Sequence, residues 1–267
     1  MFMRLVIFET LAMALLRRRW RSKLFSLLVL CLGTAAVADP LFPNSVASND
    51  LDFIRPDDPG ACWSMAPAGA GRTEMYDPRS DTLFVEAALH FDVRYPEQTL
   101  RINVHPDVGD PEARAGQAAA SVSRLPRQMR DELRYVNILN GDGSAWAEDL
   151  GRFFTLYDGL MARRLAEQDL DETVFHETAH AALDGVMSAD PDWASNQAAD
   201  GGFVTWYAAE NPRKEDVAES ALFAWTMTHY PGRLPAPVEA RVREIMPNRL
   251  EYLGNMLAEF QPPDCTR

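Results

Sequence analysis

The pattern of apolar and polar residues predicts strands in the first half of the chain. Residues 82–94 and 100–105 have the β-branched and aromatic composition of strands, and the second of these segments alternates between apolar and polar positions. Residues 135–139 and 153–157 predict two shorter strands, because turn-forming Asn, Asp and Gly residues follow them. Residues 39–72 are rich in Pro, Asp, Ser and Gly and predict an irregular lead-in.

Helices are predicted in the second half of the chain. A helix of about 18 residues is expected to start near Gln168, because apolar residues then recur at helical spacing. A polar loop is predicted at 196–202, followed by a helix over about 213–229. One or two C-terminal helices are predicted over 237–260, with an interruption at Pro247. Strands that precede helices in this way favour an α+β fold.

The first of these helices contains a His-Glu-x-x-His motif, formed by His176, Glu177 and His180. Two histidines four residues apart lie on one helical face, one turn from each other, and can bind one zinc ion. Glu177 is then placed to take a proton from the attacking water. A motif this short also arises by chance on an ordinary amphipathic helix. The apolar face, and Asp171 and Glu172 in the first turn where they suit the helix dipole, favour an active-site helix.

A catalytic zinc ion needs a third protein ligand and an open position for water. The compact pattern with a third histidine is excluded, because Leu183 and Val186 stand where that pattern has glycine and histidine. Glu215 and Glu219 lie four residues apart on one face of the next long helix, and either carboxylate can complete the site. Without a metal, the same two residues would form a solvated helix face.

The His-Glu-x-x-His motif, together with the downstream Glu-x-x-Ala-Glu sequence, resembles the gluzincin metallopeptidases. Within them it is most similar to the branch that includes anthrax lethal factor and the Mlc titration factor peptidase. The resemblance covers roughly residues 170–225. It implies that His176, His180 and Glu215 bind Zn²⁺ and that Glu219 holds the other nitrogen of a ligating histidine. It also implies a zincin-like fold with a small sheet, an active-site helix and a helical C-terminal part.

Tyr207 is a candidate for stabilising the negative charge that develops on the substrate carbonyl oxygen. It precedes Glu215 by eight residues, and the resembling branch has a tyrosine shortly before its ligand glutamate. A tyrosine of the core is an equally good interpretation. His229 and Tyr230 are weaker candidates for the same role. Asp184, one helical turn after the motif, is either a partner of a ligating histidine or an exposed acid.

The N-terminal 38 residues have the features of an export signal. A basic cluster at 17–23 precedes an apolar segment at 24–32, and Ala38 ends a small-x-small sequence. We therefore expect a signal peptide at 1–38 and a single mature domain at 39–267, periplasmic or secreted, with no stable membrane insertion. An uncleaved membrane anchor is disfavoured, because the apolar segment is short for a spanning helix.

Charge and cysteine content indicate which partners and which cross-link to expect after export. The formal net charge of −13 becomes about −18 once residues 1–38, with six basic residues and one acidic residue, are removed. Binding to nucleic acid or to an anionic membrane surface is therefore not expected. Cys62 and Cys265 remain, and in an oxidising compartment they can form a disulfide that joins the two ends of the domain; two free thiols are the alternative.

The sequence thus predicts an exported zinc peptidase that acts on a peptide or protein, with Glu177 passing a proton from water to the leaving amine. The strand at 153–157 is expected at the sheet edge, where a substrate can add as a further strand. The competing hypothesis is a secreted binding module with a non-catalytic zinc site. It is disfavoured because structural sites close the fourth position with a protein ligand. Hydrolysis of a non-peptide amide is also compatible with the motif.

Overall fold

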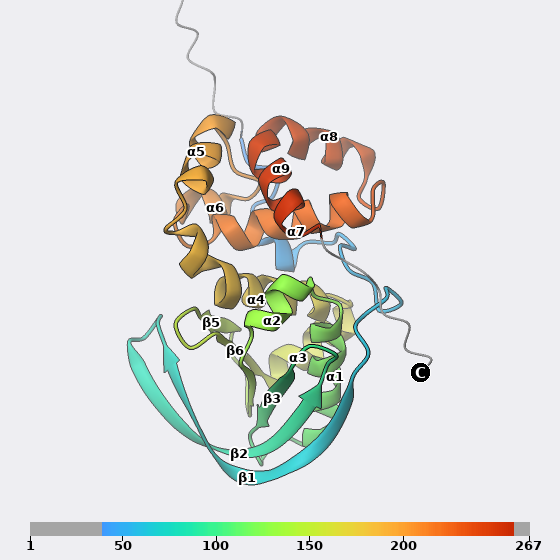
Figure 1. Cartoon of the computed structure of the whole chain (residues 1–267), viewed down its shortest axis with the longest axis vertical. Helices are drawn as coiled ribbons and strands as arrows, with labels where there is room; N and C mark the ends of the chain where they lie inside the picture. Colours follow the sequence, from blue (N-terminus) through green and yellow to red (C-terminus); the bar gives the residue numbers. More distant parts are fainter. Residues whose placement is uncertain (1–38, 259–267) are drawn as a thin grey trace, which may run out of the picture. The chain divides into compact units, whose positions relative to one another are not determined.

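The computed structural model describes residues 39–258, which form a mixed α+β fold (Figure 1). The predicted signal peptide at 1–38 and Cys265 lie outside the described residues. Cys62 is disulfide-bonded, and its pairing with Cys265 stays a prediction. Between residues 39 and 258, no helix combines the length and the apolar composition that crossing a membrane requires.

One mixed sheet contains the strands β1 (Ser64–Asp77), β2 (Thr82–Arg94), β3 (Thr99–Val104), β4 (Tyr135–Leu139), β5 (Trp146–Glu148) and β6 (Phe153–Tyr157). Their order is β1-β2-β3-β4-β6-β5. The first three strands are antiparallel, β3, β4 and β6 are parallel, and β5 is antiparallel to β6. β1 and β2 form a long bent ribbon that extends beyond the other strands (Figure 1).

Two predictions about strands are wrong. β1 begins at Ser64, inside the segment predicted to be irregular, because its Ala-, Gly- and Pro-rich residues pair with β2 despite a register shift between Pro67 and Ala70. The predicted edge strand at 153–157 is the internal strand β6, which pairs on both sides. At this end of the sheet the edge strand is β5, whose three residues are too few to produce a recognisable alternation.

The helices are α1 (Pro111–Ser123), α2 (Arg127–Glu132), α3 (Asp158–Glu167), α4 (Leu170–Met187), α5 (Pro191–Asp200), α6 (Trp206–Glu210), α7 (Asp216–His229), α8 (Ala236–Ile245) and α9 (Pro247–Met256), with a 3₁₀ turn η1 (Val46–Ser48). The predicted loop at 196–202 is wrong, because most of it belongs to α5. Asp190 caps this helix by accepting from the backbone N–H of Asp192, and Gly201 ends it in the left-handed conformation, with φ at 66°.

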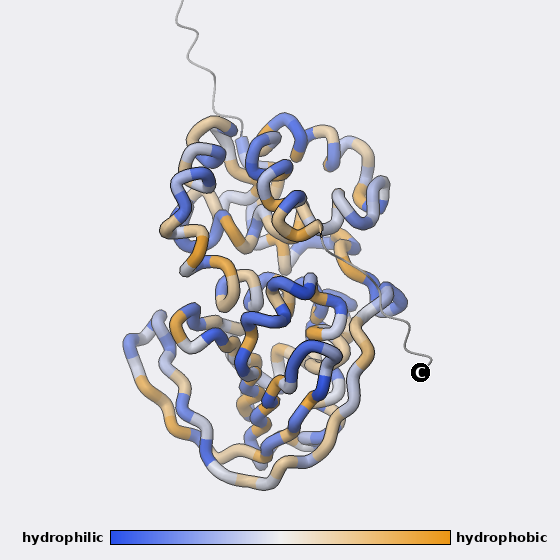
Figure 2. Tube along the Cα trace, in the orientation of Figure 1, coloured by the Kyte–Doolittle hydropathy of each residue, from blue (hydrophilic) through white to orange (hydrophobic). Residues whose placement is uncertain are grey.

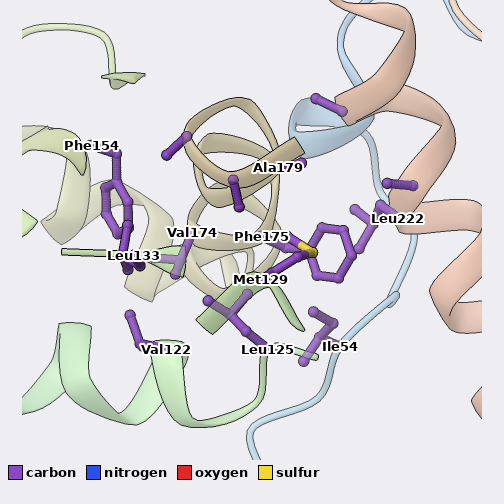
Figure 3. Close-up of a cluster of buried hydrophobic side chains, with 14 of the residues drawn as sticks. Ile54, Val122, Leu125, Met129, Leu133, Phe154, Val174, Phe175, Ala179 and Leu222 are labelled. Carbon is purple, nitrogen blue, oxygen red and sulfur yellow. The ribbon is translucent and has the colours of Figure 1, made fainter. Parts of the chain in front are cut away.

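The core surrounds α4. Fourteen of its 18 residues are buried, so this helix is enclosed on nearly all sides. Figure 3 shows Val174 and Phe175 of α4 in one cluster with Met129 of α2, Phe154 of β6 and Leu222 of α7. β6, whose apolar residues support this cluster, includes orange segments in Figure 2. The helix with the motif is therefore fixed by packing against both the sheet and the C-terminal helices.

Candidate metal centre

Three side chains from two helices meet at one point. On α4, the Nε2 atoms of His176 and His180 lie 3.1 Å apart. Glu215 is the residue that precedes α7 as its N-cap. Its Oε2 atom lies 3.2 Å from His180 Nε2 and 3.6 Å from His176 Nε2. Within residues 39–258, these three residues form the group of potential ligands that can surround one metal ion.

The spacing of these atoms fits a zinc ion. Ligand atoms bound tetrahedrally to zinc at about 2.0–2.1 Å lie about 3.3 Å from one another. The three observed separations lie close to that value. Glu215 Oε2 is buried and has no hydrogen-bond partner. Acceptor atoms that face each other in this way need a proton or a cation between them.

Each histidine also contacts a carboxylate through its other ring nitrogen. Asp184 Oδ2 lies 2.8 Å from His180 Nδ1. Glu219 Oε1 lies 3.5 Å from His176 Nδ1, and the Glu219 side chain is fully buried. Carboxylates in these positions direct the Nε2 atoms toward the centre and make the imidazoles better ligands.

The backbone N–H of Val46 completes this support by donating to Glu219 Oε2 at 2.8 Å. Val46 belongs to the predicted irregular lead-in and is 173 residues distant in the sequence. Every residue except proline has a backbone N–H group, so the amino-acid sequence does not indicate which one will donate to Glu219. The fold thus brings the segment around Val46 to the candidate centre.

The pKa values of Glu215 and Glu177 are shifted in opposite directions. Burial alone would raise the pKa of Glu215, but the neighbouring imidazoles of His176 and His180 outweigh it, and the pKa is lowered. Glu215 is therefore ionised, as a ligand must be. Burial raises the pKa of Glu177, and the two histidines only partly oppose this. A buried carboxyl with a raised pKa is suited to accept and return a proton near neutral pH.

Tyr207 lies beside the third candidate ligand. Its hydroxyl donates to Glu215 Oε1 at 2.9 Å, and 38% of the residue is exposed. It is therefore not a core tyrosine. Thr205 caps α6 by accepting from the N–H of Ala208 and so fixes the helix on which Tyr207 stands. Burial, followed by the charge of Glu215, raises the Tyr207 pKa, which keeps the hydroxyl protonated.

The remaining candidates are not part of this cluster. His229 Nε2 bonds to the carbonyl oxygen of Leu257 at 3.0 Å. Tyr230 is stacked under the guanidinium of Arg233, 3.6 Å from the ring centre. Histidines of the sheet are likewise used elsewhere, as His90 shows by bonding to Asn103 at 2.8 Å. These side chains therefore support the fold rather than the centre.

Comparisons with known proteins do not assign the chain to a family. No protein-family model matches the chain, and no curated protein matches it. One solved structure that it resembles is a point mutant of the M1 zinc metallopeptidase from Deinococcus radiodurans. That likeness has 12% sequence identity and a TM-score of 0.24, and it covers 78% of this chain and 57% of that chain. A likeness this weak does not establish a common fold.

Proposed function

We propose that the protein is an exported zinc-dependent peptidase in which His176, His180 and Glu215 hold Zn²⁺. The observation that carries this proposal is the convergence of two imidazole nitrogens and one carboxylate oxygen beside the buried carboxyl of Glu177. Three protein ligands leave one position for water, as in catalytic zinc sites. The gluzincin resemblance of the motif points to the same residues and to a zincin-like fold.

The bound zinc ion would polarise the scissile carbonyl and make water more acidic. Glu177 is the general base that takes a proton from the attacking water and passes it to the leaving amine. Burial raises its pKa, which makes that return easier. The Tyr207 hydroxyl, which donates to Glu215 Oε1, can turn to the carbonyl oxygen as negative charge develops there. Glu219 and Asp184 keep the two imidazole rings oriented throughout.

The substrate in this proposal is a peptide or an extended segment of a protein. β5 has one partner strand and lies at the edge of the sheet, against α4. The edge of a sheet offers unpaired backbone groups to which an extended chain can bond. A substrate that pairs with β5 would therefore pass along the helix that contains the motif. Export through the predicted signal peptide would place this activity in the periplasm or outside the cell.

A secreted binding module with a non-catalytic zinc site is the competing function. Such a site normally has four protein ligands. The cluster in the described part of the chain has three, with Glu177 next to them. This donor set favours the enzyme. An activity assay decides whether the substrate is a peptide or another amide.

The Glu177→Gln variant tests the proposal. It should bind zinc like the wild type and lose at least about a hundredfold of its activity on an unfolded protein such as labelled casein, because the general base is gone. Glu210→Gln, which changes an exposed glutamate on α6, is the matched control and should keep full activity. Equal hydrolysis by the Glu177→Gln and wild-type proteins would refute the assignment of the base.

A further inference from the structure

The turn between β1 and β2 places a cation at the edge of the sheet. Arg79 lies in this turn, and its Nη1 donates to the carbonyl oxygen of Ala145 at 3.4 Å, directly before β5. Its guanidinium lies over the ring of Trp146, 5.4 Å from the centroid. β1 and β5 are in contact, and the bent end of the ribbon approaches β5 in Figure 1. Arg79 thus stands beside the strand to which a substrate would add.

The guanidinium of Arg79 is oriented and yet accessible. Its Nε and Nη2 atoms donate to the two oxygens of Asp77 at 3.0 and 2.9 Å. The Asp77 side chain is 9% exposed, whereas that of Arg79 is 47% exposed. Because the Asp77 pair occupies one side of the guanidinium, the Nη1 side, whose bond to Ala145 is long, remains for an incoming group. An arginine fixed in this way loses little further entropy when it binds a carboxylate.

Arg79 is also connected to the candidate centre through β5. β5 contacts both α4 and the ribbon, so it lies between the motif helix and the turn with Arg79. Trp146 and Tyr157 line a cavity of about 330 Å³ that extends to Phe84 and Leu139. A substrate residue held at Arg79 would therefore have next to it a partly aromatic cavity, whose lining also includes Glu86, His105 and Asn140.

The charge of the surroundings indicates what Arg79 can attract. The centre contains Glu177, Glu215, Glu219 and Asp184, and the whole chain has a formal net charge of −13. The proposed zinc ion offsets only part of this negative charge, so a fixed cation beside β5 would favour the approach of a substrate carboxylate. A guanidinium matches a carboxylate in both charge and geometry.

We propose that Arg79 binds a carboxylate of the substrate and thereby determines which peptide bond is cleaved. This inference rests on the proposed peptidase function and names its substrate class. The carboxylate belongs either to the C-terminus of the peptide or to an acidic side chain. In the first case, cleavage occurs at a fixed distance from the C-terminus. In the second, an acidic residue stands at a fixed position relative to the cleaved bond.

The test is a cleavage profile of the zinc-loaded full chain on acetylated peptides of randomised sequence, made with free C-terminal carboxylates and as C-terminal amides. The wild type should prefer the carboxylate-bearing peptides, or those with a correctly placed acidic residue, by about tenfold or more. Arg79→Gln should lose this preference and keep cleavage of neutral peptides. The matched control is Arg72→Gln on the same ribbon, whose Nη2 bonds to the carbonyl oxygen of Val85; it should behave like the wild type.

Several results would overturn the inference. One is a wild-type enzyme that hydrolyses peptides without any preference for a carboxylate, and another is an Arg79→Gln profile equal to that of the wild type. If Arg79→Gln lowers the melting temperature, Arg79→Met takes its place, because it keeps an unbranched side chain beside Trp146 and removes the charge; an unchanged preference would again contradict the inference. No hydrolysis of any peptide by the zinc-loaded wild type would refute the peptidase function itself.

Discussion

At the scale of single residues, the two glutamates that the sequence left as alternatives occupy different positions relative to the histidines. Glu215 precedes α7 and points its Oε2 at both Nε2 atoms, at 3.2 and 3.6 Å. Glu219, one turn later, is fully buried and faces Nδ1 of His176 instead. This geometry favours Glu215 as the ligand and Glu219 as the partner of the ligating histidine.

A second buried glutamate on α4 should make stability depend on pH. Glu172 accepts from the N–H groups of Phe53 and Ile54 at 3.2 and 3.0 Å, and burial raises its pKa from 4.5 to about 7. The folded state therefore holds a proton that the unfolded state releases. Its stabilising contribution is complete below pH 4.5 and is lost as the pH rises through 7.

Glu172→Gln should remove this dependence. Between pH 5 and pH 8, the wild type should lose about 2–3 kcal/mol more unfolding free energy than the variant does, as measured by urea denaturation. The first-turn position of Glu172 predicted only a favourable interaction with the helix dipole, whereas the buried contacts depend on a segment about 120 residues earlier. Identical pH profiles for the two proteins would contradict this role of Glu172.

At the scale of elements, the segment before β1 acts as part of the centre. The N–H groups of Leu41 and Phe42 donate to the carbonyl oxygen of Val204, and Trp206 N–H donates to the carbonyl oxygen of Phe42. These bonds fix the start of α6, which contains Tyr207. A few residues later, η1 supplies the Val46 N–H that binds Glu219.

Val46→Pro should therefore weaken zinc binding without disrupting the turn. Proline removes the N–H group and is tolerated at the first position of a helix. Ser45 already has φ −55° and ψ 147°, which suits a residue before proline. We expect a loss of about 10–100-fold in zinc affinity, measured by competition with a chelator. Val46→Ala keeps the N–H and is the control, so equal affinities for the two variants would argue against the contact.

The elements that the sequence predicted well are those with strong local patterns. The motif helix was expected to start near Gln168, and α4 begins at Leu170 because its apolar spacing is continuous. β1 was missed because Ala, Gly and Pro carry little strand preference, and its pairing with β2 decides its structure. The helix α5 was missed because its polar residues suggested a loop, although Pro191 and Gly201 are typical boundary residues.

The same distinction applies to the site. His176, Glu177 and His180 could be found from the sequence because one helix fixes their spacing. The contacts of Val46 and Arg79 could not, because each depends on bringing distant segments together. Sequence patterns thus pointed to the candidate ligands of the centre, whereas the residues that support and surround them required the fold.

At the scale of the whole molecule, a buried ion-pair network ties the C-terminal helices to the candidate centre. Arg249 of α9 donates to Asp200 of α5 and to Asp216 of α7, and all three side chains are fully buried. Gln197 and Ser220 also donate to Asp216. Because Asp216 directly follows the candidate ligand, this network holds the start of α7 where the ligand is needed.

Arg249→Met should strongly destabilise the protein, because it leaves two carboxylates buried without a cation. We expect a loss of about 3–5 kcal/mol in unfolding free energy, measured by denaturant titration. Arg243→Met is the control on α8, where an exposed arginine pairs with Glu239 at 3.5 Å. It should cost no more than about 1 kcal/mol. Equal losses of unfolding free energy in the two variants would show that the buried ion pairs stabilise the protein no more than an exposed pair does.

The zinc content of the purified protein tests the central claim most directly. The wild type should contain about one zinc ion per chain, Glu215→Ala should contain none, and Glu219→Ala should bind zinc more weakly. Zinc is measured by elemental analysis after resupply of the metal and removal of the excess. A wild-type protein without zinc would contradict the metal centre, and loss of zinc in Glu219→Ala alone would assign the third ligand to Glu219.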